Sequence, residues 1–234
     1  MKPRIAVNCD VEERGRERLG LYSDYLDALY EAGAEPLILP PDPRALPLLG
    51  EADGALLVGG DDYAASLADP DRPPPRYLAI HPRRERFDRL LGRAVLDADL
   101  PVLGICAGYQ LLTLLEGGRI IEDIPSELGS AVLHRRARPE EERPRHRVRW
   151  SDPGIAGLGT GSETVVSHHH QGIGALPPRW RAWAVAEDGV IEGAIGPGRF
   201  QVGVQWHPEL APRDPFGRRL FGALVEAALG AIRR

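Results

Sequence analysis

The sequence predicts a single α/β domain over residues 1–234, built on a doubly wound, mostly parallel sheet with helices on both faces. In the first half of the chain, short apolar runs alternate with segments whose apolar residues recur at helical spacing. This alternation is typical of parallel strands joined by right-handed crossover helices. Between residues 147 and 205, strand-like segments follow one another without long helices, so an added antiparallel section is expected. A chain of 234 residues can bury a sizeable core.

Each element of the first half follows from its own pattern. Residues 11–18 are charged and predict a loop, and Gly33 is expected to end the helix after them. The charges of RRERFDRLL, residues 83–91, predict a solvated helix face. The predicted elements are strands at 4–8, 36–39 and 54–58, a short helix at 43–50, and longer helices at 19–32 and 84–96. The expected inward positions of the two longer helices are Leu19, Tyr22, Leu26, Leu29, Tyr30, Phe87, Leu90, Leu91 and Val95.

Three further segments are predicted to be loops or flaps. Residues 61–83 are dense in proline and aspartate, and a loop of that length inside a domain is expected to cover a site. Residues 122–130 are predicted as a loop. The charged segment 134–150 is predicted as an exposed flap, because its basic residues alternate with glutamates. The remaining predicted elements are strands at 100–105, 119–121, 147–150, 162–167, 180–186, 190–195 and 200–205, a hairpin turn at Asp188-Gly189, and helices at 111–115 and 214–232, the last with Phe216, Leu220, Leu224 and Leu229 inward.

A sharp strand-to-helix turn is predicted at residues 104–108, which read G-x-C-x-G. This is the spacing of a nucleophile elbow, with Cys106 in the place where hydrolases carry serine. The flanking glycines clear space for a strained turn, and the start of the following helix favours a thiolate. The alternative is a small buried cysteine in an ordinary turn between a strand and a helix.

Two further candidates, His207 and Glu209, come directly after the last predicted strand. Pro208 biases His207 toward an extended conformation, in which residues two apart point the same way. A thiol nucleophile needs a base, and the base needs a group that fixes its tautomer. Cys106, His207 and Glu209 match these three roles. The alternative for His207 is a capping or core histidine at a strand end.

These motifs resemble a known family. LGICAGYQLL followed by GVQWHPE is similar to the class I glutamine amidotransferases, whose Cys-His-Glu triad lies in these two motifs. Within them the sequence most resembles the gamma-glutamyl hydrolase branch, notably the gamma-glutamyl-gamma-aminobutyrate hydrolases. That branch is also matched by LLVGGDDY (56–63), VVSHHHQGIGAL (165–176) and EDGVIEGA (187–194). The resemblance covers about residues 4–232 and implies a flavodoxin-like, class I glutamine amidotransferase-like fold.

The elbow and the resemblance together supply the rest of the predicted site. An elbow provides one oxyanion-hole donor from the residue after the nucleophile, here the Ala107 N–H, and the resemblance places the second at Gly60. Gln110 lies one helical turn after Cys106 and is expected to point back over the elbow; the resemblance implies that it contacts the glutamyl group. The resemblance also implies that the glutamyl pocket is lined by Ser167, His168 and His169.

No cofactor and no metal are expected. The SHHHQ run at residues 167–171 invites a metal interpretation. However, no acidic or cysteine ligands recur at metal spacing, and adjacent residues of a strand face opposite ways. Gln171 in the same run is expected to be structural.

Composition excludes several classes of partner. A net charge of −5 and a pI of about 5.8 do not suggest nucleic acid. No apolar run approaches the ~18 residues of a membrane span, and the N-terminus has no signal-peptide pattern. The two cysteines, Cys9 and Cys106, form no disulfide framework. A catalytic thiol implies a reducing compartment, so a cytoplasmic location is expected. Cys9, at the end of the first predicted strand, is expected to fill space in the core or at the edge of the site and not to be catalytic.

The leading hypothesis is a stand-alone cysteine hydrolase that cleaves a gamma-glutamyl amide bond through a gamma-glutamyl thioester and releases glutamate and an amine. Its partner would be a small gamma-glutamyl substrate, of the gamma-glutamyl-gamma-aminobutyrate type, or glutamine. One alternative is a glutaminase component that supplies ammonia to a separate synthase partner, and another is a non-catalytic gamma-glutamyl-binding protein. The complete Cys, His and Glu set argues against the binder. The leaving amine stays open, since residue 107 is Ala where the branch often has Arg, and GICAGYQ also resembles the amidase domain of cobyric acid synthases. A homodimer is neither required nor excluded.

Overall fold

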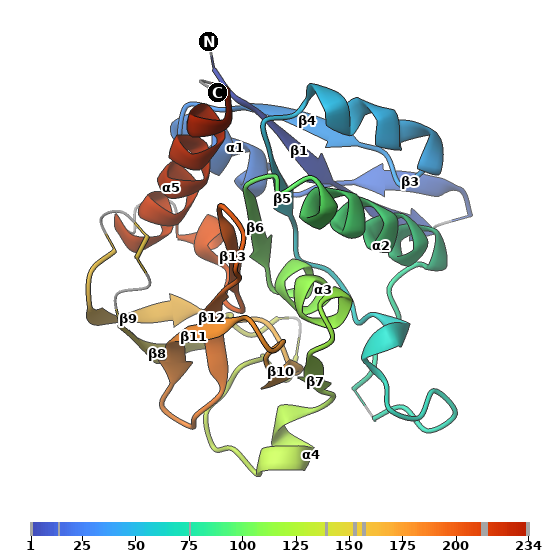
Figure 1. Ribbon diagram of the computed structural model, residues 1–234. Helices are drawn as coiled ribbons and strands as arrows, with labels where there is room; N and C mark the ends of the chain where they lie inside the picture. The colour runs from blue at the N-terminus through green and yellow to red at the C-terminus, as the bar shows by residue number, and fades with distance from the viewer. Residues whose placement is uncertain are drawn as a thin grey trace.

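A computed structural model describes residues 2–13, 15–74, 76–138, 140–151, 154–155, 158–211 and 215–232. Within them the strands form one eleven-stranded sheet and a separate two-stranded hairpin. The longer helices cover the part of the sheet nearest the two termini, while short strands, loops and the short helix α4 (Ile124–Leu128) gather at the opposite end of the molecule (Figure 1). The predicted α/β class is confirmed.

Five parallel strands form the core of the large sheet. In spatial order they are β4 (Glu35–Leu39), β1 (Arg4–Asn8), β5 (Gly54–Leu57), β6 (Val102–Ile105) and β13 (Gln201–Val204). Every residue of β5, β6 and β13 is buried. Strands buried on both faces read as nearly continuous apolar runs, and this is the pattern by which the sequence reveals them.

Alternate residues of the strands pack into two separate hydrophobic clusters, one on each face of the sheet. Ile5 and Val7 of β1 pack with Leu29 and Leu220 on one face, whereas Ala6 packs with Phe87 and other residues on the opposite face. The first face is covered by α1 (Ser23–Glu31) and α5 (Pro215–Ile232), and the second by α2 (Pro82–Asp97) and α3 (Ala107–Leu115). The sheet is therefore doubly wound, as predicted.

The antiparallel section begins where β13 pairs with β12. From β12 the sheet continues through β11 and β8 to β9, and β10 links β12 to β7. The predicted Asp188-Gly189 turn joins β11 to β12, and Gly189 adopts a φ of 89°, which suits glycine. The bounds are β7 (Arg119–Ile121), β8 (Arg145–Trp150), β9 (Gly161–Val166), β10 (Gly172–Ala175), β11 (Arg181–Ala186) and β12 (Ile191–Ile195).

The predicted loop at residues 11–18 is wrong. It forms a hairpin of β2 (Asp10–Glu13) and β3 (Glu17–Gly20), whose exposed charged residues conceal the strand pattern. As a consequence α1 begins only at Ser23, and its buried residues are Tyr25 and Leu29. The other expected inward positions are partly buried (Leu26) or exposed (Leu19, Tyr22 and Tyr30).

The predicted loop at residues 122–130 is also wrong, because it contains α4 (Ile124–Leu128). Asp123 caps this helix by accepting a hydrogen bond from the Ser126 amide, and Gly129 ends it with a φ of 60°. These signals are present in the sequence, but a single helical turn has too little periodicity to stand out. The strand β10 was missed as well. Three further segments are 3-10 helices, at Pro43–Glu51, Ala64–Ser66 and Pro208–Leu210.

Two surface predictions need correction. Arg84 and Asp88 of α2 are fully buried, whereas the expected core residue Leu90 is 43% exposed. In the predicted flap, His134 and His146 are buried, and residues 145–150 form β8.

In α5, Phe216, Leu220 and Leu224 are buried and Leu229 is partly buried. Within the described part of the chain, none of the helices combines the length and the apolar character needed to cross a membrane.

Candidate active site

A cavity of about 610 Å³ opens at the carboxyl ends of the parallel strands. Its lining includes Cys106 after β6, the Val58–Gly60 segment after β5, and His207 after β13. Ligand sites of open α/β sheets lie beyond these strand ends. The sheet therefore brings together three predicted site segments that are far apart in the sequence.

Cys106 occupies a strained turn between β6 and α3. Its φ of 51° and ψ of −108° are conformations that residues other than glycine seldom adopt. The flanking glycines are sterically required, because a Cβ at Gly108 would lie 2.0 Å from the carbonyl oxygen of Leu57, and a Cβ at Gly104 would lie 2.9 Å from Gly108. The sharp elbow expected from the sequence is present, and the N-terminus of α3 begins at the next residue.

His207 is held by Glu209, two residues further on. The Nδ1 atom of His207 lies 2.7 Å from Oε1 of Glu209, a hydrogen bond that directs Nε2 away from the carboxylate. A Cβ at Gly59 would lie 3.1 Å from Cε1 of His207 and 3.6 Å from Cβ of Cys106. The imidazole and the thiol therefore pack against the same glycine.

The electrostatics of this group favour a protonated imidazole. Burial would by itself lower the pKa of His207, but the charge of Glu209, the nearby sulfur of Cys106 and the hydrogen bond to Glu209 raise that pKa to about 10. Glu209 itself is 3% exposed. A buried imidazolium between a carboxylate and a sulfur is the arrangement that a thiolate nucleophile requires.

The glycine-rich turn after β5 is held by two side chains. The amide of Gly59 donates to the Tyr25 hydroxyl at 3.1 Å, and Nη2 of Arg84 donates to the Gly59 carbonyl oxygen at 2.8 Å. A Cβ at Gly60 would lie 2.3 Å from Nη1 of Arg84, so the turn packs directly on the guanidinium. Arg84 therefore fixes the orientation of the peptide that joins Gly59 to Gly60, the predicted oxyanion residue.

Arg84 is buried but fully paired in charge. Its Nε lies 3.1 Å from Oδ2 of Asp88, and its Nη1 lies 3.3 Å from Oδ2 of Asp10. Burial opposes the charge, but Asp88, Tyr63 and Asp10 raise the pKa of Arg84, which therefore stays protonated. The hydroxyl of Tyr63 also donates to Asp88, at 2.8 Å.

Neither Tyr25 nor Arg84 was predicted as a site residue. Tyr25 and Leu29 are spaced as i and i+4, a usable signal for the inward face of α1, but the predicted helix begins at Leu19, four residues before Ser23, where α1 begins. Arg84 and Asp88 also form an i, i+4 pair of opposite charge, and such pairs are normally on the surface. Only the position of α2 over the end of β5 distinguishes this pair from a solvated one.

We expect Arg84→Met to lower the free energy of unfolding by about 3–5 kcal/mol, because it leaves the Asp88 carboxylate buried without its partner. Urea unfolding of the purified variant measures this. Arg89→Met is a matched control, since Arg89 is an exposed residue of the same helix and should change stability by no more than about 0.5 kcal/mol. Equal losses in the two variants would show that Arg84 contributes nothing beyond a surface residue.

The other predicted residues divide between the cavity and the core. Gln110 lines the cavity and donates to Oε1 of Gln205 at 3.3 Å. His168 also lines it, and burial followed by the charge of Arg135 lowers its pKa to about 4. Ser167 is fully buried, and its hydroxyl donates to the His134 carbonyl rather than facing the cavity.

His169 reaches both the cavity and a second, buried group of side chains. It is part of the cavity wall, but its Nε2 lies 3.5 Å from Oε1 of Glu192. Gln171 also lines the cavity, and its amide nitrogen is 3.1 Å from the Ser66 hydroxyl, in keeping with the expected structural role. The neighbouring His170 lies 2.9 Å from Asp62 and 3.2 Å from Asp123, so it ties the loop after β5 to α4.

Comparisons with known proteins agree with this architecture. The family model described as Peptidase C26 matches residues 3–209. The glutamine amidotransferase-like protein YvdE of Lactococcus lactis is 30% identical over 200 residues, which cover 84% of each chain. Gamma-glutamyl-gamma-aminobutyrate hydrolase PuuD of Escherichia coli K12 is 29% identical over 241 residues, covering 94% of this chain and 91% of PuuD.

A solved structure supports the same fold. A Thermoplasma acidophilum protein described as a GMP synthase component matches with a TM-score of 0.70 at 20% identity, over 100% of this chain and 97% of that one. The sequence relatives indicate an enzyme of the hydrolase or amidotransferase type. Because the family model described as Peptidase C26 matches residues 3–209, most of its length, this chain belongs to the Peptidase C26 family.

Proposed function

We propose that this protein is a cysteine hydrolase that cleaves a gamma-glutamyl amide bond and releases glutamate and an amine. One observation carries the proposal: Cys106, on its strained elbow, and His207, which is hydrogen-bonded to Glu209, pack against the same glycine in the wall of one cavity. The relative PuuD, named as a gamma-glutamyl-gamma-aminobutyrate hydrolase, supports this substrate class.

The reaction follows from the roles of these groups. The sulfur of Cys106 attacks the gamma-carbonyl carbon, having passed its proton to His207. The carbon–nitrogen bond breaks as His207 protonates the leaving amine, and a gamma-glutamyl thioester remains. His207 then takes a proton from water, whose oxygen attacks the thioester and releases glutamate and the thiol. Glu209 orients the imidazole and stabilises its charged form.

The tetrahedral oxygen formed in each step needs preorganised donors. The amide of Ala107, at the first position of α3, and the amide of Gly60 are the proposed pair. The Gly59 amide is engaged by Tyr25 and the Gly59 carbonyl by Arg84, so the next peptide is held in one orientation. An oxyanion donor of this kind contributes about 10²–10³ in rate.

Charged side chains of both signs line the cavity and suit a substrate that is itself charged. Arg135, Arg136 and Arg143 come from the segment between α4 and β8, and acidic groups include Asp10 and Asp61. The arginines would bind carboxylates and the acidic groups would bind the alpha-ammonium of the glutamyl residue. We infer that the leaving amine carries a carboxylate, as gamma-aminobutyrate does.

The activity should persist into the alkaline range and then fall. His207 must carry a proton for the leaving amine, so kcat/KM is expected to decline as the pH rises through about 10. Because this pKa lies above the ordinary value of 6.5, protonation of His207 also stabilises the fold fully below pH 6.5 and stops doing so above about 10.

Glu209→Gln removes the charge that raises the pKa of His207 and should move the alkaline limb of the pH profile down by about 1–3 pH units. An unchanged limb in a pH profile of kcat/KM would contradict the role of Glu209.

Arg135→Gln should discriminate among substrates. For gamma-glutamyl-gamma-aminobutyrate we expect KM to rise about 10–100-fold, since a hydrogen bond to a charged group contributes about 1.5–3 kcal/mol. For a gamma-glutamyl amide of an uncharged amine, such as methylamine, the rise should be much smaller. Arg138→Gln is the control, because Arg138 is an exposed residue of the same segment outside the cavity lining. Equal effects on both substrates would remove the proposed carboxylate contact.

Steady-state assay of the purified chain on a panel of gamma-glutamyl compounds and glutamine tests the function itself. The proposal predicts glutamate release from gamma-glutamyl amides by this chain alone. Turnover of glutamine only, and only when a synthase partner is added, would contradict it and support an ammonia-supplying component. Binding without turnover would support a gamma-glutamyl-binding protein.

A further inference from the structure

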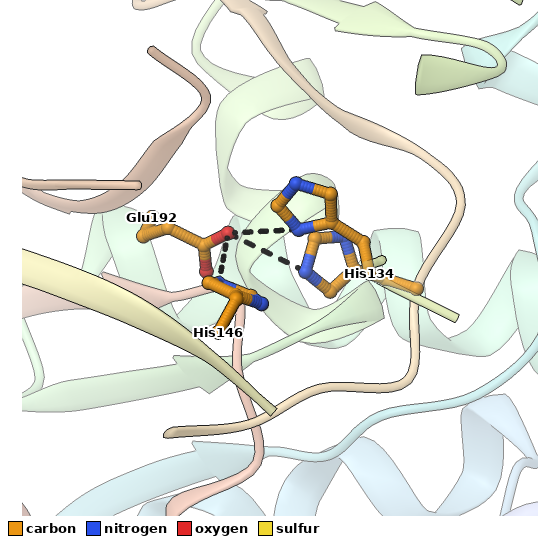
Figure 2. A group of neighbouring side chains, drawn as sticks. His134, His146 and Glu192 are labelled. Carbon is orange, nitrogen blue, oxygen red and sulfur yellow. Dashed lines mark ion pairs between the residues drawn. The ribbon is translucent and has the colours of Figure 1, made fainter. Parts of the chain in front are cut away.

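A second group of chemically active side chains lies beside the cavity and is not used in the proposed reaction. It consists of His134, His146, His169 and Glu192, which we call the histidine cluster. His146 and Glu192 lie on β8 and β12, His134 precedes β8, and His169 lies between β9 and β10. All four are at least 95% buried. Figure 2 shows the imidazoles of His134 and His146 around the Glu192 carboxylate.

The nitrogen and oxygen atoms of the histidine cluster converge on one point. Oε1 of Glu192 lies 3.3 Å from Nδ1 of His134, 3.0 Å from Nε2 of His146 and 3.5 Å from Nε2 of His169. One atom from each of the four residues lies within 4.8 Å of all the others. Zinc–nitrogen bonds of about 2.0–2.1 Å place neighbouring tetrahedral ligands about 3.3 Å apart. The three distances from the Glu192 carboxylate oxygen to the imidazole nitrogens, 3.0–3.5 Å, are close to this separation.

Two histidines of the cluster make a hydrogen bond on the side facing away from Glu192. This bond determines which ring nitrogen carries the hydrogen and which presents a lone pair to Glu192. Nε2 of His134 lies 2.9 Å from a carboxylate oxygen of Asp188, and Nδ1 of His169 lies 2.8 Å from the Gln171 carbonyl oxygen. Both partners accept hydrogen bonds, so these nitrogens carry N–H groups. The other nitrogen of each neutral ring then presents its lone pair to Glu192. Metal-bound histidines are held by the same type of outer partner.

The inward atoms are not paired with one another by hydrogen bonds. Among the described residues, none accepts or donates a hydrogen bond at Nδ1 of His134, Nε2 of His169, or either carboxylate oxygen of Glu192, and both ring nitrogens of His146 are unpartnered as well. The close approaches therefore lack hydrogen-bond alignment. The contacts with Glu192 are ion pairs only where an imidazole is protonated. With neutral imidazoles, the buried atoms lack hydrogen-bond partners, which is costly, and lone pairs that face the carboxylate repel it. A cation between them would satisfy all four groups.

We propose that the histidine cluster binds one divalent transition-metal ion, for which Zn²⁺ is the best fit, through His134, His146, His169 and Glu192. Imidazole and carboxylate ligands suit zinc, and four buried protein ligands leave no position for a substrate, so the site is structural. The ion would fasten the segment that carries Arg135 and the turn that carries His168 to the antiparallel strands. It would thereby shape the wall of the cavity.

This proposal departs from the expectation of no metal. The adjacent histidines of the SHHHQ run do not share the site, since His168 lines the cavity and His170 pairs with Asp62 and Asp123. Only His169 joins, and its fellow ligands come from three other segments. Because these four residues lie on separate segments of the chain, their spacing in the sequence does not match any local metal-ligand motif.

Metal binding can be measured directly on the untagged full-length chain. We would strip it with dipicolinate, reload it with Zn²⁺, Co²⁺, Ni²⁺, Mn²⁺, Cu²⁺ or Fe²⁺, and determine bound metal by mass spectrometry after gel filtration. The expected result is one Zn²⁺ per chain and a rise in Tm of at least about 5 °C on reloading. The Co²⁺ form should show the strong visible absorption of tetrahedral coordination.

Two ligand variants and a matched control separate this site from non-specific binding. His146→Gln and Glu192→Gln should lower Zn²⁺ affinity at least about 100-fold and abolish the rise in Tm. His170→Gln should still bind one equivalent, although it alters a buried histidine that is also paired with two carboxylates. A stripped wild-type chain that takes up none of these ions, or a His146→Gln variant that binds as much as the wild type, would overturn the proposal. Should a ligand variant not fold, the wild-type stoichiometry and Co²⁺ spectrum still decide the question.

Discussion

Cys106→Ala is expected to lower kcat/KM for a gamma-glutamyl amide by at least about 10⁴-fold, because the variant has no group that can form the thioester. The fold should be retained, since alanine removes only one buried sulfur atom and the turn itself is set by Gly104 and Gly108. Hydrolysis assays with the purified variant, together with its Tm, give both readouts.

Cys9→Ala is the matched control for this variant. Cys9 is also buried, and its sulfur lies 3.6 Å from the carbonyl oxygen of Leu39, outside the cavity lining. Burial raises the pKa of Cys9 to about 11, so it is a poor nucleophile at neutral pH. Its replacement should leave kcat/KM within a small factor of the wild-type value. Persistent turnover by Cys106→Ala would show that another group attacks the substrate.

His207→Gln should lower kcat/KM by a similar factor, about 10³–10⁴-fold or more, since the amide can neither take the thiol proton nor protonate the amine. The double variant Cys106→Ala, His207→Gln should be no slower than the slower single variant. Groups that act as one unit show this strong non-additivity, whereas independent contributions multiply.

A histidine outside the cavity provides the control for this prediction. His81 precedes α2, where its Nδ1 accepts a hydrogen bond from the Arg83 amide at 3.2 Å. His81→Gln should therefore affect stability slightly and activity hardly at all. If the two active-site substitutions instead reduce activity independently, His207 does not act on the sulfur of Cys106.

The parts of the molecule that the sequence predicted are those set by local constraints. The core strands are buried on both faces and so appear as apolar runs. The elbow was predicted because its geometry requires particular residues, as the 2.0 Å approach of a Gly108 Cβ to the Leu57 carbonyl demonstrates. His207 and Glu209 are two residues apart, and their 2.7 Å contact confirms the expected pairing. Their catalytic role remains a prediction.

The parts that the sequence did not predict depend on contacts between distant segments. Arg84 and Asp88 have the composition of a surface pair and become buried only because α2 packs across the end of β5. The histidine cluster draws on four segments, and the spacing of its members along the chain carries no metal signature. The β2–β3 hairpin is held by backbone pairing between charged strands, so it lacks an apolar pattern.

The buried polar groups near the cavity share one consequence for function. Arg84 holds the Gly59–Gly60 turn, His170 holds the loop after β5, and the histidine cluster lies behind the residues around His168. Each lies outside the Cys106, His207 and Glu209 group and positions part of its surroundings. Precise placement of donors and reacting groups is what preorganised catalysis needs.

In the proposed reaction, the sulfur of Cys106 becomes covalently attached to the gamma-glutamyl group. Rapid acid quenching during turnover, followed by peptide mass spectrometry, measures this directly. We expect a mass increase of one gamma-glutamyl group on the peptide that contains Cys106, and none on the peptide that contains Cys9. The contradicting result is turnover at full rate with no adduct on Cys106, either in the wild type or in the Glu209→Gln variant, together with undiminished activity of Cys106→Ala.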